Sequence, residues 1–149
     1  MAVAQIDSHR YKRVMGEEEM AVAQRAIDLW IGGDRDAAWA MWSEDCVGVP
    51  NRDWPEPGPW NGREKLRAEF QSWDTAFGQD WTTHLAVREM TDLGDGRVLL
   101  EIEFKASGVE SGLPVDQELA VIETISGGEI VRADFFMNWA ESRRAAGLE

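Results

Sequence analysis

Apolar residues recur at helical spacing in three segments of the first half of the chain. In the first segment they lie three or four residues apart, at Met20, Ala23, Ile27 and Trp30. This spacing places them on one face of a helix, which we predict to begin at Glu17 and to end at the glycine pair 32–33. Asp34 is a suitable N-cap for a short second helix that presents Ala38, Trp39 and Trp42. In the third segment, Asn61 and Glu64 have the spacing of a capping box ahead of Leu66, Phe70, Trp73 and Phe77.

The rest of the chain carries short apolar runs bounded by turn residues, a pattern that is typical of strands. We predict a first strand at residues 46–49 and four more at residues 81–90, 97–106, 115–125 and 129–139. Glycine-containing turns at 93–96 and 126–128 are short enough for hairpins, and residues 107–114 make a longer connection. The proline-rich stretch 50–59 cannot hold regular structure, because each proline fixes φ and removes an N–H donor. The order is helices first, then an antiparallel meander.

Alternation along the strands indicates which face is buried. One face of residues 97–106 is wholly apolar and carries Val98, Leu100, Ile102 and Phe104. One face of residues 129–139 carries Val131, Ala133, Phe135, Met137 and Trp139, while Asp134 lies on the other. Helices over one face of a strongly twisted sheet leave a cavity at its open end. The predicted fold class is therefore α+β, a cone-shaped, barrel-like curved antiparallel sheet wrapped by three helices of the N-terminal half.

Length and charge limit the partners of this chain. Its 149 residues fit one domain, which we predict at residues 17–149 after an N-terminal arm at residues 1–16. The net charge of −13 argues against nucleic acid and membrane surfaces as partners. Without a long apolar stretch or a signal-peptide pattern, we expect a cytoplasmic protein. The single cysteine, Cys46, precludes an internal disulfide, and no metal-ligand cluster or phosphate-binding loop is evident, so we expect no cofactor.

The eight tryptophans are the unusual feature of the composition. A tryptophan has a large rigid apolar face and an N–H that needs a partner. Two interpretations stay open, that most of these side chains are ordinary core or that some line a cavity for a ligand. From the helix and strand faces we predict a ligand pocket lined by Trp30, Trp42, Trp60, Phe70, Trp73, Leu100, Ile102, Phe104, Val121, Ala133, Phe135 and Met137.

Three short segments occur in a characteristic order: Trp-Ile-Gly-Gly-Asp at 30–34, Pro-Gly-Pro-Trp-Asn-Gly-Arg-Glu at 57–64 and Gly-Glu-Ile-Val-Arg at 128–132. With the ending Ala-Ala-Gly-Leu at 145–148, this set resembles the SnoaL-like domains of the nuclear-transport-factor-2-like (NTF2-like) superfamily, which includes polyketide cyclases, ketosteroid isomerases and limonene-epoxide hydrolases. The resemblance implies a cone-shaped α+β domain that binds a small hydrophobic molecule without metal or organic cofactor. It also implies a homodimer formed through the outer face of the sheet.

The same resemblance assigns catalytic positions, and this chain departs from the family at each of them. The inward Arg and Asp of the epoxide hydrolases correspond to Ile102 and Phe104, the acidic residue on the last strand to Phe135, and the cyclase histidine to Val121. None of these side chains can move a proton. The reaction type therefore stays open.

Three polar residues remain as candidate catalytic groups. Glu123 shares a strand face with Leu119 and Val121, so it is either a partly buried carboxylate with a raised pKa or a solvated charge at a strand end. Asp134 would reach the pocket only if the last strand were shifted by one residue. Asn51 either holds a substrate oxygen or forms a turn.

The sequence leaves two functions open. The chain is either a cofactor-independent cyclase, isomerase or hydrolase acting on a polyketide-, terpenoid- or steroid-like substrate, or a non-catalytic ligand-binding or dimeric interaction module.

Overall fold

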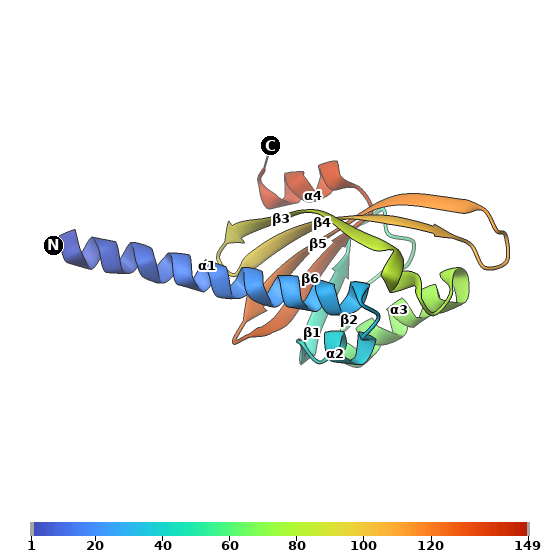
Figure 1. Cartoon of the computed structure of the whole chain (residues 1–149), viewed down its shortest axis with the longest axis horizontal. Helices are drawn as coiled ribbons and strands as arrows, with labels where there is room; N and C mark the ends of the chain where they lie inside the picture. Colours follow the sequence, from blue (N-terminus) through green and yellow to red (C-terminus); the bar gives the residue numbers. More distant parts are fainter. Residues whose placement is uncertain (1, 149) are drawn as a thin grey trace.

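The computed structural model describes residues 2–148, with side chains from residue 16 onward. The elements of this part follow one another along the chain (Figure 1) as α1 (Ala2–Ile31), α2 (Arg35–Trp39), β1 (Trp42–Pro50), β2 (Trp60–Asn61), α3 (Arg63–Phe77), the 3-10 helix η1 (Trp81–His84), β3 (Leu85–Gly94), β4 (Arg97–Ser107), β5 (Pro114–Ser126), β6 (Glu129–Phe136) and α4 (Trp139–Ala146). No helix of this part is both long enough and apolar enough to cross a membrane.

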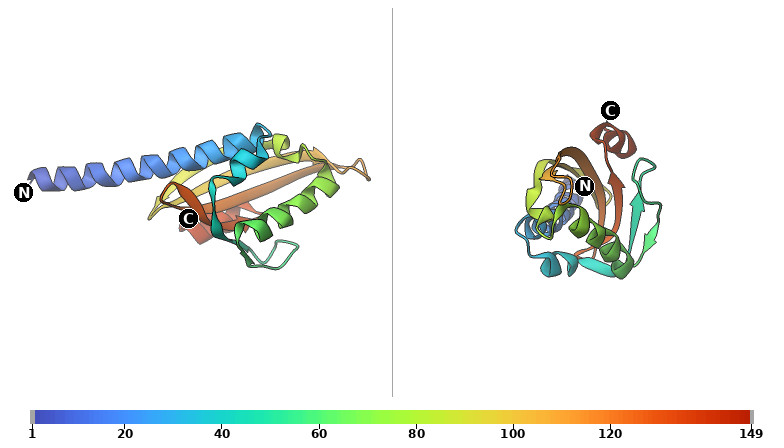
Figure 2. Two further views of the ribbon diagram at one scale, coloured as in Figure 1. Left: turned by 90° about the horizontal axis from the view of Figure 1, so that it is seen from below. Right: turned by 90° about the vertical axis from the view of Figure 1, so that its right-hand side faces the viewer.

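The strands form one curved, open sheet in the order β2-β1-β6-β5-β4-β3, which confirms the predicted fold class. The sheet is not wholly antiparallel, because β6 returns between β1 and β5 and runs parallel to β1. Figure 2 shows the sheet curving around α3, with α4 on the opposite face. The main core lies on the concave side, and a smaller one lies under α4 around Leu99, Ala120, Ile122 and Phe136.

The first helix begins well before the predicted start at Glu17. It runs from Ala2 to Ile31, and its first half projects beyond the sheet (Figure 1). Apolar periodicity arises where a helix packs on a core, so a projecting segment carries no such pattern. The side chains of residues 2–15 lie outside the described part of the structure, and the predicted arm at residues 1–16 stays a prediction.

The caps of the next two helices differ in how well the sequence predicted them. The carboxylate of Asp34 accepts a hydrogen bond from the backbone N–H of Ala37 at 3.3 Å, which confirms the N-cap of α2. The predicted capping box before α3 is wrong. Asn61 pairs with Val47 in the β1–β2 ladder, and Gly62, at φ 97°, is the N-cap with no side-chain bond. The backbone of Asn61 is paired in the sheet, so Asn61 does not take the N-cap position that the capping box required.

Several strand ends were also predicted incorrectly. Trp42, predicted on the second helix, is the first residue of β1, which therefore begins before the predicted residue 46. Residues 81–84 form η1, and the strand begins only at Leu85. The last strand ends at Phe136, because Asn138 caps α4 by accepting a hydrogen bond from the backbone N–H of Glu141 at 3.0 Å. Trp139, predicted to face the cavity, thus begins a helix and packs on the outer face of the sheet.

The faces of the central strands agree with the predicted alternation. Val98, Leu100, Ile102 and Phe104 all belong to the main core. In β6, Ala133 and Phe135 face inward. A register irregularity between Thr124 and Ile125 pairs Ile125 with Ile130 and turns Ile130 into the same core. A bulge of this kind adds a residue to one strand, so alternation alone does not locate it.

Candidate functional site

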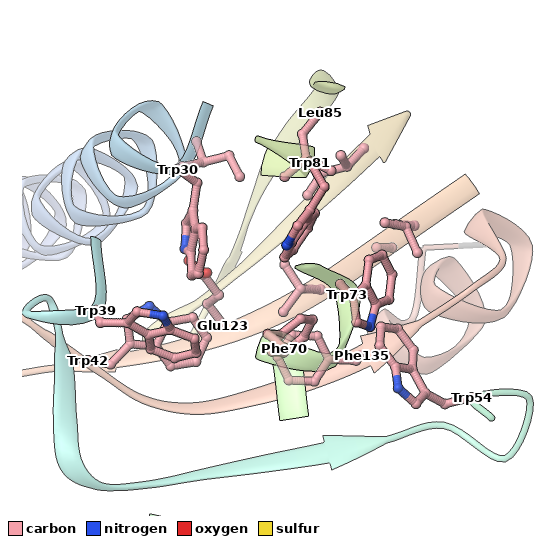
Figure 3. Close-up of a pocket in the computed structure, with 15 residues that line it drawn as sticks. Trp30, Trp39, Trp42, Trp54, Phe70, Trp73, Trp81, Leu85, Glu123 and Phe135 are labelled. Carbon is pink, nitrogen blue, oxygen red and sulfur yellow. The ribbon is translucent and has the colours of Figure 1, made fainter. Parts of the chain in front are cut away.

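A cavity of about 80 Å³ lies between the helices and the concave face of the sheet (Figure 3). Every element of the domain except β2 and α4 contributes to its wall, which is formed by Ile27, Trp30, Trp39, Trp42, Trp54, Phe70, Trp73, Trp81, Leu85, Ile102, Leu119, Ala120, Val121, Glu123 and Phe135. Pockets for drug-sized ligands have volumes of roughly 300 Å³ or more. As it stands, this cavity accommodates a compact molecule or the head group of a larger one.

Most of the residues in the wall are aromatic, and their rings pack against one another. The centroids of Trp30 and Trp39 lie 5.1 Å apart with the planes at 79°, and those of Trp39 and Trp42 lie 5.4 Å apart at 51°. At the other end, Trp54 stacks on Trp73 at 5.7 Å. Edge-to-face and offset contacts of this kind are favourable for aromatic pairs. The walls are therefore preorganised around the empty space.

Among the described residues that line the cavity, Glu123 has the one titratable side chain. It is 5% exposed, and on the flanking strands its register partners are Val98 and Ala133. Its Oε1 has no hydrogen-bond partner. Burial therefore raises the pKa of Glu123 from its ordinary value of 4.5 to about 8. At pH 7 the protonated form of Glu123 is therefore the more abundant, and a rise of about one pH unit makes the carboxylate equally abundant.

Two indole N–H groups of the wall also lack a partner. Nε1 of Trp42 and Nε1 of Trp54 are buried without a hydrogen bond. By contrast, Nε1 of Trp81 donates to the carboxylate of Asp74 at 2.9 Å. Buried polar groups are normally satisfied, and leaving one unpaired costs on the order of 1–3 kcal/mol. An apolar wall with an unpaired acceptor and two unpaired donors is suited to a ligand that carries complementary polar groups.

Several residues of the predicted pocket line this cavity, namely Trp30, Trp42, Phe70, Trp73, Ile102, Val121 and Phe135. The others are placed in the core around it, where Trp60, Leu100, Phe104 and Ala133 are buried and Met137 is half-buried. The prediction missed Trp39, Trp54 and Trp81. Trp39 was assigned to the correct helix face. Trp54 lies in the proline-rich loop, where no periodicity indicates the direction of a side chain.

The other two catalytic candidates lie away from the cavity. Asp134 is on the outer face, where both its oxygens accept hydrogen bonds from Arg132 at 3.0 Å, and the one-residue shift that would turn it inward does not occur. The side-chain Nδ2 of Asn51 donates a hydrogen bond to the carboxylate of Asp53 at 3.1 Å. The backbone carbonyl of Asn51 accepts a hydrogen bond from the backbone N–H of Trp54 at 2.9 Å. This is the geometry of a turn.

The positions that the family resemblance assigns to catalysis are inward and apolar. Ile102 and Phe104 in β4, Val121 in β5 and Phe135 in β6 all belong to the main core. Within residues 16–148, no group of three or more His, Cys, Asp and Glu side chains is arranged to hold a metal ion. The chemistry of the cavity therefore centres on Glu123.

Comparisons with known proteins show the fold. No family model matches the sequence, and no curated protein matches it. Among solved structures, a proposed isomerase from Bacillus subtilis is 16% identical with a TM-score of 0.68, covering 91% of this chain and 96% of that one. A proposed SnoaL-like polyketide cyclase from Jannaschia sp. CCS1 is 14% identical with a TM-score of 0.67, covering 89% and 94%.

A third neighbour was solved with a ligand. It is a hypothetical protein with a ketosteroid isomerase-like fold from Catenulispora acidiphila DSM 44928, in complex with trimethylamine. It is 15% identical with a TM-score of 0.63, covering 86% of this chain and 93% of that one. At such identities the comparison establishes architecture alone. The chain has the NTF2-like fold of SnoaL-like proteins.

Proposed function

We propose that this NTF2-like chain binds a compact, largely apolar molecule in the aromatic cavity and that Glu123 exchanges a proton with it. The observation that carries the proposal is an unpaired carboxylic group, 5% exposed, in the wall of a cavity that is otherwise apolar. Burial raises the pKa of Glu123 to about 8. A group with a pKa near the working pH is suited to both accept and donate a proton.

The reaction classes that fit are isomerisation, cyclisation and hydrolysis without a cofactor. As carboxylate, Glu123 removes a proton from a carbon beside a carbonyl, and the resulting acid returns the proton to the same or another atom. The unpaired N–H of Trp42 is a suitable donor to the substrate oxygen, and that of Trp54, at the other end of the cavity, is available to a second polar group. The neighbours described as isomerase and polyketide cyclase support this choice of chemistry.

The size of the cavity narrows the substrate. About 80 Å³ does not enclose a polyketide, terpenoid or steroid skeleton, so we propose a small substrate or the compact end of a longer one. The trimethylamine held by the neighbour from Catenulispora acidiphila is also a compact molecule. Trp54, which closes one end from a loop, is the side chain whose displacement would enlarge the space.

Hydrogen–deuterium exchange tests this function without knowledge of the natural substrate. Small ketones, enones and lactones are incubated with the protein in D₂O, and exchange beside the carbonyl is followed by NMR. We expect exchange that rises as pH passes through about 8, where the Glu123 carboxylate forms, and that is lost in Glu123→Gln. Glu129→Gln removes the same charge from an exposed position and is the matched control. Equal exchange by wild type and Glu123→Gln contradicts the proposal.

A second candidate is a binding module without catalysis. It is favoured by the apolar residues at all the positions that the resemblance assigns to catalytic groups, such as Ile102 and Val121. Saturable binding with no Glu123-dependent exchange identifies this case.

We also propose a homodimer through the part of the outer sheet face that α4 leaves uncovered, and light scattering of the purified chain measures its mass.

A further inference from the structure

Glu123 lies at a corner of the cavity that is built from indole rings. Trp30, Trp39, Trp42 and Glu123 all line the cavity, and in the view of Figure 3 they gather toward the same end of it. The planes of Trp30 and Trp39 are nearly perpendicular, and Trp42 is inclined at 51° to Trp39. Rings at such angles do not form one flat stack. They are the sides of a cage that presents aromatic surface from several directions.

This corner of the cavity is electrostatically negative when Glu123 is ionised. The face of an aromatic ring carries the negative part of its quadrupole, and tryptophan attracts cations most strongly of the aromatic residues. Among the described residues that line the cavity, none is Lys, Arg or His. The register partners of Glu123 are Val98 on β4 and Ala133 on β6, and α1 contributes Ile27 and Trp30 to the same cavity; none of these side chains bears a charge. The chain as a whole carries a net charge of −13.

These features favour one class of ligand. An anion would be repelled by both the negative ring faces and the carboxylate of Glu123, and a wholly apolar molecule would leave Oε1 of Glu123 without a partner. A primary ammonium or a guanidinium needs several hydrogen-bond acceptors, while Glu123 supplies the only side-chain acceptor among the described lining residues and the indole N–H groups are donors. A methylated ammonium has few or no N–H groups and is held by ring faces and one counter-charge.

We infer that the ligand carries a compact alkylammonium head, of the trimethylammonium kind, which packs in the cavity against the rings of Trp30, Trp39 and Trp42 and against the carboxylate of Glu123. This rests on the proposed function, since it names the class of molecule that the same cavity takes. The volume of about 80 Å³ favours a compact head over a whole drug-sized molecule, whose pockets have volumes of roughly 300 Å³ or more.

Binding of a cation is coupled to a proton. Burial raises the pKa of Glu123 to about 8, so below that pH the group is mostly protonated. A cation stabilises the carboxylate, and the proton leaves to solvent. Affinity for a cation therefore rises with pH up to about 8, roughly tenfold per pH unit, and levels off above it. A neutral ligand that accepts a hydrogen bond from protonated Glu123 shows the opposite dependence.

The test is isothermal titration calorimetry with three probes at pH 6.5 and 9. Tetramethylammonium is the head group alone, choline is a head group with a short tail, and 3,3-dimethylbutan-1-ol has the shape of choline with carbon in place of the charged nitrogen. We expect choline to bind at least about tenfold tighter than the neutral alcohol at pH 9 and about thirtyfold weaker at pH 6.5 than at pH 9. Two buffers with different ionisation enthalpies report the release of one proton at pH 6.5.

The variants separate charge from shape. Glu123→Gln keeps the volume and removes the charge, so we expect it to lose the preference for choline over the alcohol and the dependence on pH. Glu129→Gln controls for the change in net charge, and Trp42→Phe, which keeps an aromatic face, is expected to weaken choline several-fold without removing the preference. Folding of each variant is checked by circular dichroism.

The inference is overturned if the alcohol binds as tightly as choline, or if neither tetramethylammonium nor choline binds at millimolar concentration at pH 9. It is also overturned if Glu123→Gln keeps the preference of the wild type. The proposed function is judged separately by the exchange experiment. Exchange of neutral ketones that depends on Glu123, together with no cation binding, refutes the ammonium head and leaves the function standing.

Discussion

The buried carboxyl of Glu123 makes the stability of this protein depend on pH. Burial raises its pKa from 4.5 to about 8 in the folded state, whereas an unfolded chain exposes the group to water. Between these values the folded protein keeps a proton that the unfolded chain has released. The free energy of unfolding therefore falls as pH rises from about 4.5 to about 8, and the loss is complete above that range.

The magnitude follows from the two pKa values. At about 1.4 kcal/mol per pH unit, the rise from 4.5 to about 8 corresponds to about 5 kcal/mol, of which about 3 kcal/mol is lost by pH 7. Domains of this size are stable by only about 5–15 kcal/mol. The carboxyl group of Glu123 thus lowers the free energy of unfolding at neutral pH by an amount that is large beside the total. No hydrogen bond to its Oε1 offsets this cost.

Substitution of Glu123 by glutamine isolates this contribution. Urea denaturation of wild type and Glu123→Gln is followed by tryptophan fluorescence at pH 5.5, 7 and 8.5. Because glutamine does not titrate, we expect wild type to lose about 3 kcal/mol more than the variant between pH 5.5 and 8.5. Glu129→Gln controls for surface charge. If wild type and Glu123→Gln differ by less than about 0.5 kcal/mol in this pH response, Glu123 is not a buried acid and the reasoning fails.

Three further predictions concern the scaffold, and each is measured as the free energy of unfolding in urea. Arg143 binds both oxygens of Glu101 at 2.9 and 2.8 Å, and the Glu101 side chain is only 2% exposed, so Arg143→Met should lower the free energy of unfolding by leaving a buried carboxylate unpaired. A Cβ on Gly48 would lie 2.7 Å from Cδ1 of Leu66, so Gly48→Ala should cost about 1–3 kcal/mol. Loss of the α2 cap in Asp34→Ala should cost about 1 kcal/mol.

Each of these has its own control. The double variant Arg143→Met with Glu101→Leu should recover most of the lost stability, and no recovery would show that Arg143 acts by packing alone. Asp34→Asn keeps a capping oxygen and should stay close to wild type. An unchanged free energy of unfolding in Gly48→Ala would mean that Leu66 moves aside without cost.

Much of the fold could be predicted because it depends on residues that are close in sequence. The cap at Asp34 and the faces of β4, from Val98 to Phe104, follow from local spacing, and the structure confirms both. The errors lie at the ends of elements. Asn61 was assigned to a cap and Trp139 to a strand, and in each case a distant element determines the outcome, β1 in the first and the outer sheet face in the second.

The sequence by itself determined that Glu123 shares a strand face with Leu119 and Val121, because alternation along a strand is a local property. Only the tertiary structure decided that this carboxyl group has no partner and that Trp54 closes the same cavity from an irregular loop. The energy of a buried charge depends on every group around it, and here those groups come from helices, strands and a loop far apart in the chain.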